Sequence, residues 1–118
     1  MPLDRVAERL RDILEFSEKI RLYVGGCDFS DFAADSKTVD AVLRNLELIG
    51  EAVRHIPKDV LEAEPSIGWQ DIRDSRSVFA HDYWAIDDSI VWRIVTDDLP
   101  KLEGAVHRLL AARIASSE

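Results

Sequence analysis

Three side chains in one short segment have the types that phosphodiester chemistry uses: Arg76, His81 and Tyr83, in the spacing Arg-x4-His-x-Tyr. Cleavage of RNA without a metal ion needs a base for the ribose 2′-hydroxyl, an acid for the leaving 5′-oxygen and a cation for the charged phosphorane. His81 could be base or acid, because an unperturbed imidazole titrates at about pH 6.5. Arg76 could hold a phosphate with two N–H groups, and Tyr83 could donate to it or stack on a base.

The helical pattern around this motif limits how its residues can meet. Residues five positions apart differ by roughly 140° around an α-helix, so Arg76 and His81 do not share a face of a straight helix. Either the helix breaks near His81, or the site uses both chains of a dimer. Arg73, Ser77 and His81 do form one stripe, because their spacing is four and eight positions, and Arg73 is therefore a second candidate phosphate ligand.

A purely structural interpretation uses the same residues. Arg76 could pair with Asp71 or Glu51, His81 could be a partly buried histidine with its hydrogen bonds satisfied, and Tyr83 could lie at the edge of the core. On residue types and spacing alone this interpretation is favoured. Glu51 lies on a helix that should pack beside the motif, so we expect it to orient an arginine, Arg73 or Arg76, rather than to act directly in catalysis.

The elements that must position the motif are helical. Apolar residues recur at three- and four-residue steps from about Asp4 to Val24, which predicts an amphipathic helix ended by Gly25–Gly26. The segment Cys27–Ala34 is expected to be a short connector in which Phe29 and Phe32 fold back onto the core.

A second long helix is predicted from a cap at Asp35 or Ser36 to the residue before Pro57, because one broad face is apolar throughout. Residues 57–68 contain two prolines and a glycine, which indicates a short helical turn followed by a loop. A third helix, from about Trp69 to Tyr83, carries the motif.

A further helix is predicted to begin near Ile90, with capping groups in residues 87–89. Pro100 lacks a backbone donor and clashes with the preceding turn, so this helix must kink or restart there, and Asp97 and Asp98 are placed to cap a restart. No run alternates in the manner of a strand. We expect an all-α bundle of four to five helices, a single domain over residues 1–118 with its last helix kinked at Pro100.

Composition and charge exclude several classes of protein. With 47% hydrophobic and 32% charged residues, the chain is typical of a globular protein rather than a disordered one. Cys27 is the only cysteine, so no disulfide can form within the chain, and neither a leader nor a membrane span is apparent. We expect a cytoplasmic protein. A net charge of −8 gives no general attraction for nucleic acid, so any RNA site must be local or assembled from two chains.

The remaining histidines do not suggest a metal centre. His55 precedes Pro57 at the predicted end of the second helix, where it favours capping, and His107 is expected to be structural or exposed. The three histidines lack the spacing of metal ligands, and no glycine-rich phosphate loop is found. We therefore expect no metal site and no cofactor.

The residues around the motif resemble a known family. The frame consists of Trp69, Ile72, the motif itself, Ile86–Asp87, Val91–Trp92 and the segment Asp97–Leu102, preceded by the second-helix segment Arg44–Ala52. This frame is similar to HepT-like ribonuclease domains of the HEPN superfamily, the toxins of type VII toxin–antitoxin systems. The resemblance implies a bundle that forms a homodimer or a higher oligomer and cleaves RNA without a metal ion, with Arg76 and His81 at the catalytic positions. It also implies neutralisation by a cognate nucleotidyltransferase antitoxin, which can transfer AMP to the motif tyrosine, here Tyr83.

One residue departs from the family's pattern. The position after the arginine usually carries asparagine or another polar amide or acid, whereas this chain has Ser77. A hydroxyl still forms hydrogen bonds, but it has a shorter reach and fewer donors. An alternative is therefore a catalytically weak HEPN domain whose task is to bind the nucleotidyltransferase.

Overall fold

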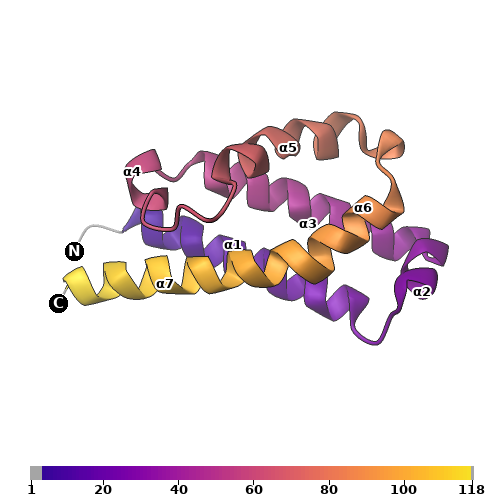
Figure 1. Ribbon diagram of the computed structural model, residues 1–118, viewed down its shortest axis with the longest axis horizontal. Helices are drawn as coiled ribbons and strands as arrows, with labels where there is room; N and C mark the ends of the chain where they lie inside the picture. Colours follow the sequence, from indigo (N-terminus) through magenta and orange to yellow (C-terminus); the bar gives the residue numbers. More distant parts are fainter. Residues whose placement is uncertain (1–3, 118) are drawn as a thin grey trace.

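The computed structural model describes residues 4–117, and within this range the chain is helical and contains no strand. The expected all-α fold with a kinked last helix is confirmed (Figure 1). Its elements in chain order are α1 (Arg5–Val24), α2 (Phe29–Ala34), α3 (Ser36–Arg54), α4 (Lys58–Leu61), α5 (Trp69–His81), the 3₁₀ turn η1 (Tyr83–Ala85), α6 (Asp88–Arg93), the π-helical turn η2 (Ile94–Asp98) and α7 (Leu99–Ser117).

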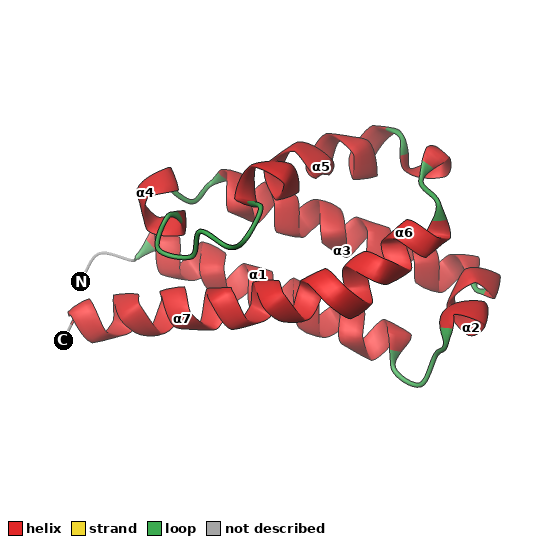
Figure 2. Ribbon diagram, viewed as in Figure 1, coloured by secondary structure: helices red, strands yellow, loops and turns green. Residues whose placement is uncertain are grey.

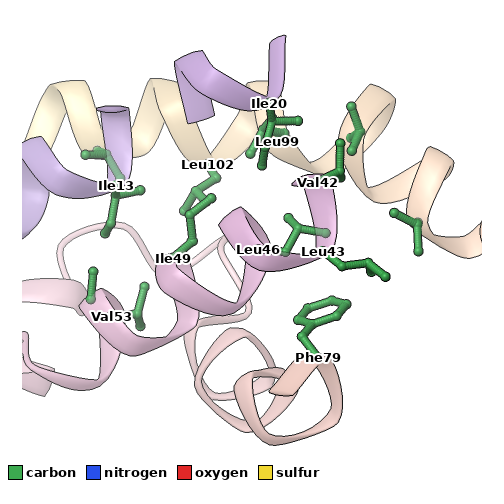
Figure 3. Close-up of a cluster of buried hydrophobic side chains, with 14 of the residues drawn as sticks. Ile13, Ile20, Val42, Leu43, Leu46, Ile49, Val53, Phe79, Leu99 and Leu102 are labelled. Carbon is green, nitrogen blue, oxygen red and sulfur yellow. The ribbon is translucent and has the colours of Figure 1, made fainter. Parts of the chain in front are cut away.

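Helices α1, α3 and α7 form the main core. α1 packs against both α3 and α7, and buried apolar residues of all three helices belong to one core cluster. Figure 3 shows Ile13 and Ile20 from α1, Val42 from α3 and Leu102 from α7 directed into one shared interior. Ile13, Ile20 and Val42 are fully buried. Burial of such side chains stabilises the fold by about 1.5–3 kcal/mol each, which makes these three helices the stable part of the molecule.

The predicted connector Cys27–Ala34 contains a short helix, which is a correction. Asp28 accepts a hydrogen bond from the backbone N–H of Asp31, and the Asp31 carboxylate accepts one from the backbone N–H of Asp28. This reciprocal capping satisfies two free donors and starts α2. Phe32 is fully buried as expected, whereas Phe29 keeps 41% of its surface exposed and meets Trp92 edge-on.

The segment between α3 and α5 agrees with the prediction of a short helical turn followed by a loop. α4 has four residues, and the chain after it winds back to the start of α5 without further helix (Figure 2). α3 begins at the expected cap, where the Asp35 carboxylate accepts a hydrogen bond from the backbone N–H of Thr38. These caps fix the entry of α3, the helix on which α5 rests.

The disturbance of the helix that Pro100 causes lies in the turn that precedes it. Of the two outcomes that the sequence left open, a kink and a restart, the kink is the observed one. Asp97 and Asp98 do not cap a restarted helix, which corrects that part of the expectation. Instead, the N–H of Leu99 reaches back five residues to the carbonyl of Ile94, so the chain widens into the π turn η2. The wider turn accommodates a residue that has no N–H and crowds the carbonyl four positions earlier. α6 and α7 therefore run on as one bent helix (Figure 1).

Among residues 4–117, none of the helices combines the length and the apolar composition that crossing a bilayer requires.

Candidate functional site

The crossing of α5 over α3 is closest at Gly50, directly beneath Arg76. Gly50 is buried, and a Cβ atom placed on it would lie 2.9 Å from the carbonyl oxygen of Ile72 and 3.0 Å from the Cβ of Arg76. Only a residue without a side chain allows this approach. The glycine in the second-helix segment therefore sets the height of Arg76 above α3.

Glu51, the next residue along α3, forms an ion pair with Arg76. The Nε of Arg76 lies 3.1 Å from Glu51 Oε2, and the two side chains keep 34% and 37% of their surface exposed. Of the two partners considered for Arg76, Glu51 is thus the observed one, and Arg73 takes no part in this pair. Because Nε faces the carboxylate, the two terminal nitrogens of the guanidinium remain available for a second anion.

His55 completes a chain of polar contacts through Glu51. Its Nε2 lies 3.0 Å from Glu51 Oε1, one helical turn further along α3, and Arg54 approaches Oε2 at 3.7 Å. An ionised carboxylate has no proton to give, so Nε2 must carry the hydrogen and donate it. Oε1 of Glu51 is therefore hydrogen-bonded to His55, whereas Oε2 is buried without a hydrogen bond among residues 4–117 and has only the charge contacts of Arg76 and Arg54.

The electrostatics keep Glu51 ionised. Its pKa is lowered, first by the hydrogen bond from His55 and further by the positive charges of Arg76 and Arg54, while partial burial opposes the shift. Hydrogen bonds and nearby cations both favour the charged form of a carboxyl group. Glu51 is consequently a fixed negative charge that holds Arg76 in one orientation.

His55 is the residue that sequence reasoning missed. It is the C-terminal cap of α3, as expected, but it also binds Glu51. The signal was present in the sequence, because positions 51 and 55 are four apart and share a helix face. Because His55 was interpreted only as a cap, its contact with Glu51 was not predicted.

His81 is the last residue of α5, and it is exposed. The predicted third helix ran to Tyr83. In the structure it ends two residues earlier, because Asp82 leaves the helical region at φ −121° and ψ 25°. The backbone stays helical up to His81, so the break comes too late to turn this side chain toward the face of Arg76. The separation of roughly 140° between the two residues persists within one chain.

The stripe expected for Arg73, Ser77 and His81 follows from the regular helix α5. Arg73 is half-buried, and Ser77 and His81 are exposed. Within residues 4–117, none of these three side chains forms an ion pair or a hydrogen bond. They are accessible on one side of α5, beside the face that carries Arg76.

Tyr83 begins the 3₁₀ turn η1, and its side chain keeps 50% of its surface exposed. It lines a shallow cleft of about 280 Å³ between α3 and the end of α5, together with Phe79, Ala80 and polar residues of α3 that include Arg44 and Glu47. Tyr83 is therefore reachable from outside. Across residues 4–117, no group of three or more potential metal-ligating side chains is found.

Comparison with known proteins places the chain in a family. The family model described as "Ribonuclease HepT-like" matches residues 13–109. That match spans most of the helical bundle and includes all the candidate site residues. The chain belongs to the HepT-like ribonuclease family.

Relatives of the HepT-like protein carry ribonuclease names. It is 38% identical over 100 residues to a protein of Thermococcus cleftensis named "Probable ribonuclease HepT", covering 85% of this chain and 91% of that one. It is 37% identical over 100 residues to a protein of Methanocaldococcus jannaschii that is named as a putative RNase, covering 85% and 83% of the two chains. No solved structure gives a significant match. By homology the activity is that of a ribonuclease.

Proposed function

We propose that this HepT-like protein is a metal-independent endoribonuclease that acts as the toxin of a HepT-type toxin–antitoxin system. The observation that carries the proposal is Arg76, paired with Glu51 through Nε, on the same helix as an exposed His81. A clamp for a phosphate and a proton carrier are the two functions that RNA cleavage needs from side chains.

The reaction follows from these groups. The neutral imidazole of His81 removes the proton of a ribose 2′-hydroxyl, whose oxygen attacks the adjacent phosphorus. Arg76 binds the non-bridging oxygens and stabilises the added negative charge of the phosphorane. The bond to the 5′-oxygen breaks, and this oxygen takes a proton from an imidazolium. The products are a 2′,3′-cyclic phosphate and a 5′-hydroxyl, with no net consumption of protons.

The site we propose is shared between two copies of the chain. Arg76 and His81 lie on different faces of α5, so one chain does not direct both toward the same phosphate. A two-fold contact along α5 would bring His81 of the partner subunit toward Arg76. Val78 of α5 keeps 44% of its surface exposed, so its apolar side chain is available to such a contact.

The test begins with purified protein and single-stranded RNA in the presence of EDTA. We expect cleavage that yields cyclic phosphate ends by mass spectrometry, and a loss of about 10²–10⁴-fold in rate for His81→Ala. His107→Ala, which removes an exposed histidine from α7, is the matched control and should cleave at the wild-type rate. Intact RNA, or equal cleavage by His81→Ala, would show this mechanism to be wrong.

Mixing two inactive variants tests whether the site is shared. Arg76→Ala supplies an intact His81, and His81→Ala supplies an intact Arg76. In randomly mixed dimers, half are heterodimers and each has one complete shared site, so activity should return to about a quarter of the wild type. Sites confined to one chain predict no recovery.

For control of the toxin, we propose a nucleotidyltransferase antitoxin that transfers AMP to Tyr83. The exposed phenol supports this, because a transferase must reach it. A bulky anion beside Arg76 would compete with the phosphate of RNA. Intact-mass analysis after co-expression with the antitoxin should show increments of one AMP that disappear in Tyr83→Phe. The absence of such increments in the wild type would exclude this form of control.

Ser77 motivates the alternative of a weakly active domain whose task is to bind the nucleotidyltransferase. The residue is exposed beside Arg76, where the family pattern has a longer polar side chain. Ser77→Asn separates the two functions. If the wild type is nearly inactive and Ser77→Asn restores cleavage, the binding function is supported, whereas strong wild-type cleavage removes it.

A further inference from the structure

Trp84 is the most exposed aromatic side chain on the face next to His81. It keeps 72% of its surface exposed, more than Tyr83 beside it at 50%. The two rings meet edge to face, with centroids 5.9 Å apart and an interplanar angle of 80°. With 72% of its surface exposed, the indole remains open to a further ring beside Tyr83.

The other two tryptophans have structural partners. Trp69 is half-buried, and its Nε1 donates to the carbonyl of Glu64 at 3.0 Å. Trp92 is half-buried and packs against Phe32, with ring centroids 5.1 Å apart. Among residues 4–117, Trp84 has only Tyr83 as a ring partner and no hydrogen bond of its indole N–H. The fold of the single chain therefore gives no reason for a large apolar ring at this position.

The turn that carries Trp84 is ordered and close to the catalytic histidine. The N–H of Ala85 donates to Asp82 at 3.0 Å, and that of Ile86 donates to Tyr83 at 3.2 Å, which fixes η1 against the end of α5. Trp84 follows His81 by three residues, a separation of at most roughly 11 Å along the chain. A base on this ring would hold a neighbouring ribose near His81.

We propose that Trp84, with Tyr83 at its edge, is a stacking platform for an unpaired base of the RNA substrate. This inference rests on the proposed ribonuclease function and adds the recognition of a single-stranded nucleotide next to the cleaved bond. Aromatic rings bind unpaired bases by stacking in a way that tolerates any sequence, because every base has a π face.

The charges around the turn support a base rather than a phosphate as the ligand. Asp82 and Asp87 flank the platform, and the whole chain carries a net charge of −8. The hydrogen bonds from Ser89 lower the pKa of Asp87, which keeps it ionised. These carboxylates disfavour a phosphate as the group bound directly on the ring of Trp84, whereas they do not oppose a neutral base face. Stacking therefore provides affinity where a general electrostatic attraction is missing.

A protein partner is the less favoured occupant. Stable protein interfaces bury about 1,200–2,000 Å² around an apolar centre. Here two rings stand on a three-residue turn whose third residue, Ala85, is small, and Asp82 before the turn is charged; Ile86 after it is partly buried against the core. The patch is of the size of a nucleotide base rather than of a protein interface.

Tryptophan fluorescence provides a readout that does not depend on cleavage. The probe is a short single-stranded 2′-O-methyl oligoribonucleotide, which cannot be cleaved because its 2′-oxygen carries no proton. We expect the oligonucleotide to quench the fluorescence of the full chain, and Trp84→Phe to lose this quenching while circular dichroism shows an unchanged fold. A duplex of the same sequence should quench much less, because its bases are already stacked. Equal quenching of Trp84→Phe and the wild type would overturn the proposal.

Kinetics give the second measurement. Trp84→Ala should raise KM for single-stranded RNA by roughly ten- to a hundred-fold with little change in kcat, and Trp84→Phe should restore most of the loss. Tyr23→Ala, which removes an exposed aromatic residue at the end of α1, is the matched control and should leave KM unchanged. An unchanged KM in Trp84→Ala would overturn the platform but leave the ribonuclease function standing.

Two further outcomes separate the hypotheses. Quenching by the oligonucleotide without any RNA cleavage would support the platform and overturn the proposed enzyme. If Trp84→Ala changes the oligomeric state in sedimentation while quenching by the oligonucleotide persists, the ring belongs to a protein contact and the proposal is wrong.

Discussion

Helices α3 and α5 pack against each other but contribute to the molecule in opposite ways. α3 contributes nine buried residues, and it packs on α1 as well as on α5. α5 has 13 residues and buries only Phe79, which points toward Leu43 and Leu46 of α3 (Figure 3). Its main neighbour is α3, on one side only. One helix holds the fold together, and the other is attached to it.

This difference explains where charged residues can stand. A helix with one buried side chain loses little hydrophobic stabilisation when its remaining positions are polar, so α5 can carry Arg73, Arg76 and His81. The attachment then depends on a few contacts: the close approach at Gly50, the apolar side chains of Phe79, Trp69 and Ile72, and the pair between Arg76 and Glu51. The bundle is the rigid part of the molecule, and α5 carries the candidate catalytic side chains.

The largest difference between the two regions should appear in stability. Ile13→Ala removes a fully buried side chain from α1, which should lower the free energy of unfolding by about 2–5 kcal/mol, because the cavity is only partly refilled. His81→Ala should leave it unchanged within about 0.5 kcal/mol, because the side chain is exposed. Urea denaturation measures both. A comparable loss of unfolding free energy in the two variants would contradict this difference between the bundle and α5.

Gly50→Ala tests the attachment itself. The new Cβ would meet the carbonyl oxygen of Ile72 at 2.9 Å, and that oxygen belongs to the backbone of α5 and cannot rotate away. Overpacking costs about 1–3 kcal/mol and the better helix propensity of alanine returns at most about 1 kcal/mol, so the net loss should reach about 2 kcal/mol. The rate of RNA cleavage should fall even at temperatures where the variant is folded, because Arg76 moves with α5. The lower stability alone would not explain such a decrease.

Gly104→Ala is the control for that variant. Gly104 lies in α7, and the nearest atom to its added Cβ is the flexible end of Arg108 at 3.4 Å. The substitution should stabilise the fold by about 0.5–1 kcal/mol and leave cleavage unchanged. Equal behaviour of the two glycine variants would show that the crossing at Gly50 does not set the position of Arg76.

Much of the fold follows from apolar periodicity, whereas the site depends on how two helices meet. The stripes of α1, α3 and α7 predicted a helical bundle, and the cap at Asp35 or Ser36 predicted where α3 begins. The helix α2 was missed because its signal is the pair Asp28 and Asp31, three residues apart, rather than a periodic stripe.

Pairing within the site needed information that a linear pattern does not contain. Arg76 could have paired with Asp71 on its own helix or with Glu51 on α3, and the choice depends on the height and register of α5 above Gly50. The wide turn before Pro100 could not be predicted for a similar reason. A proline predicts that the helix is disturbed, but it does not predict which hydrogen bonds replace the lost one.

A polar group inside the main bundle offers a smaller test. Ser17 of α1 is fully buried, and its hydroxyl has no hydrogen-bond partner among residues 4–117. Ser17→Ala should therefore raise the free energy of unfolding by about 1 kcal/mol, because an unsatisfied buried hydroxyl costs about that much. Thermal unfolding followed by circular dichroism measures the gain. A loss of similar size would show that the hydroxyl is satisfied in solution.

The smallest expected effect concerns the titration of Glu51, where the two regions touch. Its lowered pKa comes mainly from His55, so a carbon-detected NMR titration should find the Glu51 carboxyl below its ordinary range, and His55→Ala should raise that pKa. The sign for stability follows. A carboxyl group with a lowered pKa in the folded protein stabilises the fold above its unfolded pKa, and this contribution disappears as the pH falls through the folded value. His107→Ala is the matched control and should leave the titration unchanged. If His55→Ala also leaves it unchanged, Arg76 rather than His55 holds the carboxylate.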